Sequence, residues 1–150
     1  MKILCIVPCG KKKIWDKNPA VGETKAKDVY IGLYAKTCKE YADRFYPSSW
    51  CFLSAKYGFL FPDDIVKGNY DISFKNKSSN PITSEELIKQ VMDKGLNTYD
   101  KIISLGGKDY SKVIKEVFGD KVVYEPLKSL KIGQKLQKLK NAINEGIPLS

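Results

Sequence analysis

Four short apolar runs along the chain predict buried β-strands. Residues 2–8 (KILCIVP) form a β-branched run that stops at a proline and a glycine, and residues 49–55 (SWCFLSA) form a second run. Residues 99–105 and 121–124 have the same character. Continuous apolar runs of this length are typical of strands that are buried on both faces of a sheet.

Between and after these runs, apolar residues recur at spacings of three and four, which predicts amphipathic helices. Four segments show this period: residues 24–45, 83–96, 109–118 and 132–145. Pro47 follows the first segment and ends it. The second segment opens with a capping box, in which Thr83 is followed three residues later by Glu86.

The alternation of strands and helices predicts the fold class. A parallel neighbour in a sheet is reached only through a crossover, so we expect an α/β protein with a three-layer αβα sandwich. The sheet should be mostly parallel, with about four strands. No repeat or linker divides the chain, and residues 1–150 are therefore predicted to form one domain.

In sheets of this kind, ligands bind beyond the carboxyl ends of the strands. The residues expected at these ends are 8–11, 54–58, 106–108 and 125–127. A long aromatic segment, residues 56–81, has neither a helical nor a strand period. Such irregular excursions in compact domains are commonly functional, so we expect it to contribute to the site.

The charge of the chain indicates a polyanionic partner. There are 26 basic and 17 acidic residues, a net charge of +9, and Arg44 is the single arginine. Lysine contacts phosphates as a point charge, whereas reading of base edges usually falls to arginine. The alternative is that these lysines only form a solvated surface.

The absence of histidine excludes several kinds of catalytic site. Serine or cysteine nucleophiles paired with histidine, histidine-containing zinc sites and histidine acid/base catalysis are all ruled out. Catalysis must then use carboxylates, lysine, tyrosine, cysteine or an activated water. We expect no metal and no cofactor.

The four cysteines, at positions 5, 9, 38 and 51, form no C-x-x-C pair and match no common zinc spacing. The apolar run at the N-terminus is too short for a signal peptide, and no apolar run of the chain is long enough to span a membrane. We therefore expect a cytoplasmic protein with reduced thiols, no membrane association and no obligate protein partner.

The segment from Cys9 to Lys13 (CGKKK) is the first candidate for chemistry. Gly10 lets the backbone approach a ligand, and ammonium groups such as those of Lys12 and Lys13 lower the pKa of a neighbouring thiol. Cys9 is thus a candidate nucleophile. The alternative is a small buried residue followed by solvated lysines.

Two further stretches are candidates for substrate binding. Gly106 and Gly107, just before a helix, are typical of an anion-binding turn, although tight strand-to-helix turns use the same residues. A cation, aromatic rings and carboxylates also gather around the second strand end and are suited to clasping a base by stacking. These candidates are Ser54, Lys56, Tyr57 and Gly58, with Asp64 and Asp71 further on. The alternative is a loop that covers the sheet edge.

Several blocks together resemble a known family. They are Pro8-Cys9-Gly10-x-Lys12, residues 27–30 (KDVY), residues 50–58 (WCFLSAKYG), and residues 126–136. On these blocks, the chain resembles the uncharacterised phage and bacterial family related to the YaaA protein.

This resemblance implies a fold like that of uracil-DNA glycosylases and a role in base modification. The Pro-Cys-Gly loop is also similar to the archaeosine synthase catalytic domain, which modifies a 7-deazaguanine base. This chain departs from that motif after Cys9 and has no histidine.

Three functions follow as hypotheses. The first is hydrolysis of the N-glycosidic bond of a modified base, with DNA ranked ahead of RNA and of a free nucleobase or nucleotide. Its candidate carboxylates are Asp28, Asp64 and Asp71, and Tyr30 and Tyr57 are expected to stack on the base. The second is cysteine-dependent modification of a 7-deazaguanine-type base. The third is a non-catalytic protein that binds a base in nucleic acid.

Overall fold

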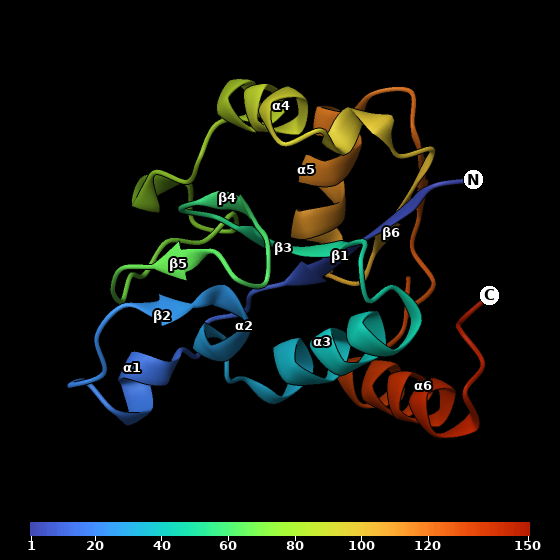
Figure 1. Cartoon of the computed structure of the whole chain (residues 1–150), viewed down its shortest axis with the longest axis horizontal. Helices are drawn as coiled ribbons and strands as arrows, with labels where there is room; N and C mark the ends of the chain where they lie inside the picture. The colour runs from blue at the N-terminus through green and yellow to red at the C-terminus, as the bar shows by residue number, and fades with distance from the viewer.

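The computed structural model describes residues 1–150, and a five-stranded sheet lies at its centre (Figure 1). The strands are β1 (Ile3–Pro8), β3 (Trp50–Ser54), β4 (Gly58–Leu60), β6 (Lys101–Ser104) and β7 (Val122–Tyr124). Their order is β4-β3-β1-β6-β7. All neighbours are parallel except β3 and β4, which are antiparallel. The predicted α/β class with a mostly parallel sheet is confirmed.

Helices cover both faces of this sheet. The main helices are α3 (Leu33–Phe45), α4 (Ser84–Asp93), α5 (Lys108–Phe118) and α6 (Ile132–Glu145). Helices α3 and α6 pack together on one face, and α4 and α5 pack together on the other (Figure 1). No helix combines the length and the apolar character needed to cross a lipid bilayer.

Alternate residues of β1 supply the two sides of the core. Cys5 and Val7 belong to the apolar cluster beneath α3 and α6, whereas Leu4 and Ile6 belong to the cluster beneath α4 and α5. Successive side chains of a strand point to opposite faces, so a run that is apolar throughout fills both clusters.

The fifth strand, β4, differs from the expected four-stranded sheet. It holds only three residues, too few to show a period, and it lies in the segment predicted to be irregular. Gly58 opens it with φ +77°, a left-handed conformation that favours glycine. The Gln90 side chain fills the space beside Gly58 and accepts a hydrogen bond from the Phe59 amide at 2.8 Å.

The segment predicted as one helix over residues 24–45 is broken in the structure. It begins as β2 (Thr24–Lys25) and a single turn, α2 (Ala26–Val29), and then becomes extended before α3. The break has a tertiary cause, because Tyr30 pairs with Lys13 in an antiparallel bridge and the Ile31 amide donates to the Lys12 carbonyl at 3.1 Å. The extended backbone brings Tyr30 beside the end of β1.

The remaining short elements are α1 (Ile14–Lys17), β5 (Ile65–Val66), η1 (Lys77–Ser79) and η2 (Leu96–Thr98). Strands β2 and β5 form a separate two-stranded antiparallel sheet. Together with α1 and α2, this small sheet lies beyond the carboxyl end of β1 (Figure 1). These elements surround the site described next.

Candidate active site

A cavity of about 500 Å³ lies where β1, β3 and β6 end. The loop after β1 lines it with Cys9, Gly10, Lys11 and Lys13, and the loop after β3 adds Ala55. The start of α5 supplies Asp109 and Tyr110, and residues 70–76 form the remaining wall. The chain passes from β1 to β3 and β4 on one side and then crosses to β6 and β7 on the other, so the strand order reverses at β1. This is the switch point at which parallel α/β sheets bind ligands.

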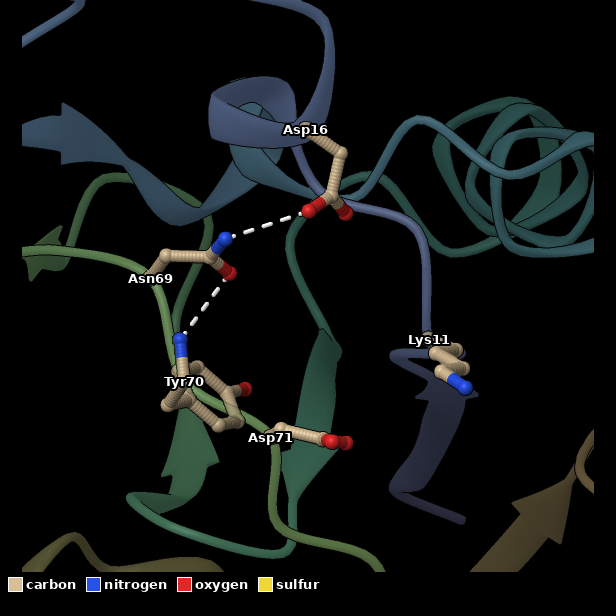
Figure 2. A pocket seen from close by; sticks show the side chains of 5 residues that line it. All are labelled: Lys11, Asp16, Asn69, Tyr70 and Asp71. Atoms are coloured by element: carbon tan, nitrogen blue, oxygen red, sulfur yellow. Dashed lines mark hydrogen bonds between the residues drawn. The ribbon is translucent and has the colours of Figure 1, made fainter. Parts of the chain in front are cut away.

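A second cavity, of about 390 Å³, adjoins the first and shares three lining residues with it: Lys11, Tyr70 and Asp71. Figure 2 shows Asn69 between Asp16 and the backbone of Tyr70. The Asn69 amide nitrogen donates to Asp16 at 3.1 Å, and the Tyr70 amide donates to the Asn69 side-chain oxygen at 2.9 Å. These two hydrogen bonds attach the wall segment to α1.

Asp71 is the carboxylate that both cavities share. It is exposed, and it takes part in none of the hydrogen bonds or ion pairs of the structure. In Figure 2, its carboxylate and the Lys11 side chain lie on opposite sides of the smaller cavity. The other carboxylate of the larger cavity, Asp109, is 3.8 Å from the Lys75 ammonium. Asp71 is therefore the one free to act on a ligand.

Hydrogen bonds behind the cavity begin at Ser54, the buried last residue of β3. Its Oγ accepts from the amides of Lys56 at 3.2 Å and Tyr57 at 3.1 Å, and lies 2.8 Å from the Tyr70 hydroxyl. A serine oxygen has two lone pairs, and both are used here. Ser54 must therefore donate its proton to Tyr70.

Two tyrosine hydroxyls extend this hydrogen-bonded group. The Tyr70 hydroxyl, which accepts from Ser54, is also 2.5 Å from that of Tyr30, and either tyrosine can donate to the other. Both tyrosine hydroxyls lie close to the Cys9 thiol, and hydrogen bonding from them acts to lower its pKa. The chain of hydroxyl groups positions Tyr70 at the cavity and ends on the cysteine sulfur.

Cys9 lines the cavity but is only 3 % exposed. Burial raises the pKa of its thiol to about 12, against the opposing effects of the Tyr30 and Tyr70 hydrogen bonds and the Lys13 charge. The lysines alone would lower this pKa, but desolvation outweighs them. Cys9 is thus a protonated thiol at neutral pH, and all four cysteines are free and buried.

The structure assigns the aromatic roles differently from the sequence. Tyr30 is 2 % exposed and packs on Phe52 with ring centres 5.0 Å apart, so it has no free face for a base. Tyr57 does not line the cavity and meets the Tyr70 ring at its edge, 5.4 Å between centres. The rings that line the cavity are those of Tyr70, Phe74 and Tyr110.

Of the candidate lysines, only Lys13 lines the larger cavity. Lys13 is only 3 % exposed, donates to the Lys11 carbonyl at 2.9 Å and lies 4.3 Å from the centre of the Tyr70 ring. Its pKa is lowered by burial, which nearby Cys9, Asp16 and Asp71 oppose. Lys12 and Lys56 are exposed and do not line the cavity, although the Lys56 ammonium is 5.6 Å from the Tyr70 ring centre.

Two of the three candidate aspartates lie outside the cavities. Asp28 is exposed on α2. Asp64 accepts from the Phe61 amide at 2.7 Å and lies 3.9 Å from the Lys94 ammonium, which gives it a role in a turn. The structure thus brings Asp71 together with Cys9, and it separates both from Asp28 and Asp64.

The candidate glycines have packing roles. A Cβ on Gly106 would lie 2.7 Å from the Cβ of Tyr110, so this glycine lets α5 approach β6. Gly107 precedes the first residue of α5, and neither residue lines a cavity. Gly58 sets the turn into β4. Gly10 does line the larger cavity, with φ +71° and its amide donating to the Tyr110 hydroxyl at 3.3 Å.

Sequence reasoning missed Phe74 and Tyr110 as cavity residues, and it placed Lys11 and Tyr70 in candidate segments without assigning them a role. Lys11 stands within the lysine run itself, so its position was an available signal. Tyr70 and Phe74 lie in the irregular segment, where no period indicates which side chains point inward. Tyr110 follows the two glycines by three residues, one helical turn, and that spacing was a usable signal.

Known proteins resemble this chain over almost its whole length. A family model described as "Family of unknown function (DUF6884)" matches residues 4–141, a range that includes both cavities. The uncharacterized protein YfjM of Bacillus subtilis (strain 168) is 44 % identical over 147 residues, which are 97 % of each chain. No solved structure matches the chain.

Proposed function

This chain belongs to the DUF6884 family, and we propose that it is a base-acting enzyme that hydrolyses the N-glycosidic bond of a modified base in DNA. One observation carries the proposal. The unpaired carboxylate of Asp71 lies on the wall of a cavity that also presents aromatic rings and lysines, at the switch point of the sheet.

Asp71 supplies the chemistry that such a reaction requires. Breaking the bond between the sugar and the base gives C1′ an oxocarbenium-like character, which a carboxylate stabilises. Asp71 takes a proton from water, the water oxygen bonds to C1′, and the electron pair of the C1′–N bond leaves with the base, which then gains a proton. No histidine is needed for this sequence.

The rings of the cavity suit a base that has left the duplex. Tyr70 is held by the Ser54 and Tyr30 hydroxyls, and Phe74 and Tyr110 pack edge to face with centres 5.7 Å apart. Stacking on such rings stabilises a bound base by about 1 to 3 kcal/mol and tolerates different bases. The net charge of +9 favours a phosphate-bearing substrate.

The finer classification is part of this proposal. We place the sheet with those of uracil-DNA glycosylases and the family with YaaA. The four parallel strands between two helix layers support the first assignment. The sequence blocks around Cys9 and from Trp50 to Gly58 support the second.

Cysteine-dependent modification of a 7-deazaguanine-type base is less well supported. It requires a thiolate, and burial keeps the Cys9 thiol protonated at neutral pH. The structure instead gives Cys9 a packing neighbour in Tyr30 and an end position in a hydroxyl chain.

The test is base release from DNA. Purified protein is incubated with bacterial and phage DNAs that carry different modified bases, and free bases are measured by mass spectrometry alongside abasic sites. We expect release from one class of modified DNA. Asp71→Asn should lower the rate by about 100-fold to 10,000-fold, the usual contribution of a general base. Asp28→Asn, an exposed aspartate outside the cavity, is the matched control and should keep the rate.

Other results would redirect the assignment. Binding of DNA without release of any base from any substrate would contradict the enzyme and support a non-catalytic base-binding protein. Equal rates for Asp71→Asn and the wild type would remove Asp71 as the base. Loss of activity in Cys9→Ser, with normal folding and an active Asp71→Asn, would favour the cysteine mechanism.

A further inference from the structure

The ammonium group of Lys13 is a buried charge without a carboxylate partner. The residue is 3 % exposed, yet the five ion pairs of the structure involve other lysines. Its single hydrogen bond goes to the Lys11 carbonyl at 2.9 Å, and the Tyr70 ring centre lies 4.3 Å away. Asp16 and Asp71 are near enough to act on its charge, but neither forms an ion pair with it. An ammonium has three donors, so two remain unused.

Such an arrangement is costly for the protein alone. Buried charges in proteins are normally paired, because desolvation of an ammonium is compensated only by an opposite charge or several hydrogen bonds. A carbonyl and a ring face compensate it only in part. Lys13 lines the larger cavity, so a ligand entering this cavity meets a cation that is already desolvated and fixed in place.

We infer that Lys13 is a phosphate-binding residue and that the substrate of the cavity is a nucleotide unit whose phosphate pairs with this ammonium. The inference rests on the proposed function. It adds a binding site for the phosphate of the substrate, which takes no part in breaking the bond between the sugar and the base. A phosphate fits because it offers several strong acceptor oxygens and a full negative charge to the two free donors. A neutral nucleoside offers neither.

The rest of the cavity agrees with a nucleotide. Lys11 lines the same cavity without an ion pair and adds a second cation for the phosphate. The aromatic rings of the wall accept the base, and Asp71 is available for the sugar carbon between the two. The volume of about 500 Å³ lies within the range of small-ligand sites.

The experiment compares ligands that differ only in phosphate. Binding of a deoxynucleoside, its 5′-monophosphate, inorganic phosphate and a short single-stranded oligonucleotide is measured by calorimetry. We expect the wild type to bind the monophosphate at least about tenfold more tightly than the nucleoside, a difference of about 1.4 kcal/mol. Lys13→Met should abolish this preference. Lys12→Met, the exposed lysine next to it, should retain it.

The oligonucleotide arm distinguishes a phosphodiester in DNA from the phosphate of a free nucleotide. Preference for the oligonucleotide assigns the subsite to DNA, and preference for the monophosphate assigns it to a free nucleotide. Equal binding of nucleoside and nucleotide by the wild type, or a preference that survives in Lys13→Met, would overturn the inference and leave Lys13 with a packing role.

A second measurement applies if Lys13→Met does not fold. The lysine side chains of the wild type are labelled with ¹³C at Cε, and the Lys13 signal, displaced by the nearby Tyr70 ring, is identified with Lys13→Arg. Inorganic phosphate should shift this signal and leave that of Lys12 in place. An unchanged Lys13 signal would contradict the inference. Phosphate binding without release of a base would refute the proposed function but not the subsite.

Discussion

The two faces of the sheet are built from different chemistry. The core beneath α4 and α5 consists of aliphatic and phenylalanine side chains, with the one thiol of Cys51. The core beneath α3 and α6 contains three cysteines and four tyrosine and tryptophan residues that carry polar atoms, among them Cys9 and Tyr30. The first core packs against two rings of the cavity, Phe74 and Tyr110, whereas the second extends to the strand ends and itself contains Cys9.

The polar groups of the second core do not weaken it, because each has a partner. The Tyr34 hydroxyl donates to the Leu105 carbonyl at 2.6 Å, and the Tyr41 hydroxyl accepts from the Leu149 amide at 3.0 Å. No buried side-chain nitrogen or oxygen of the structure lacks a hydrogen bond. A core can therefore carry a polar site at its edge if every hydroxyl group is satisfied.

The largest effect on stability should come from the purely apolar face. Leu87 of α4 is fully buried there, and Leu87→Ala should lower the free energy of unfolding by about 2 to 5 kcal/mol because it leaves a cavity. Urea unfolding measures the change, with Ile88→Ala, 46 % exposed on the same helix, as the control. At temperatures where the variant stays folded, nucleotide binding should be unchanged. Altered binding would show that the two faces are coupled.

A smaller effect is expected from the polar face. Tyr30→Phe removes a buried hydroxyl, so the Tyr70 hydroxyl loses one hydrogen-bond partner and the Cys9 thiol loses another. The free energy of unfolding should fall by about 1 to 3 kcal/mol, the usual cost of an unsatisfied buried group. Unlike the change at Leu87, this one should also weaken base binding, because Tyr70 is no longer fixed. Tyr57→Phe, whose hydroxyl has no partner in the structure, is the control; equal effects of both variants would contradict the hydroxyl chain.

The smallest effect should come from the surface contact that anchors the wall. The pKa of Asp16 is lowered by the hydrogen bond from the Lys13 amide and then by Asn69. A carboxyl group with a lowered folded pKa stabilises the protein above its unfolded pKa, and this contribution is lost as the pH falls through the folded value. Asp16→Asn should therefore unfold at a slightly lower temperature than the wild type at about pH 7, and the difference should close as the pH falls through the lowered pKa of Asp16. A difference that persists in acid would assign it to something other than the charge.

Much of the sheet could be predicted because its strands are continuous apolar runs. The predicted strand over residues 2–8 is β1, and those over residues 99–105 and 121–124 contain β6 and β7. The helix break before α3 could not be predicted in this way. The period of three and four continues through it, and the pairing of Tyr30 with Lys13 that interrupts it is a contact between distant segments.

The location of the candidate site could be predicted from the sequence, but the set of residues that line it could not. The rule that ligands bind at strand ends gave the loop after β1, and Cys9, Gly10 and Lys13 do line the larger cavity. Which aspartate shares that cavity depends on how the irregular segment folds back, and Asp28, Asp64 and Asp71 look alike in sequence. Burial decides the state of Cys9, and burial is a property of the whole fold.

The wall from Asp71 to Asn76 belongs to no strand of the main sheet and no main helix. Its backbone is closed on itself by a bridge between Ser73 and Asn76, and its side chains are mostly exposed. Apart from Phe74, which packs against the core beneath α4 and α5, residues of this stretch can be substituted without removing a core contact. Most residues that shape the wall are therefore distinct from those that keep the protein folded. Directed evolution of ligand preference can begin in this stretch with little loss of stability.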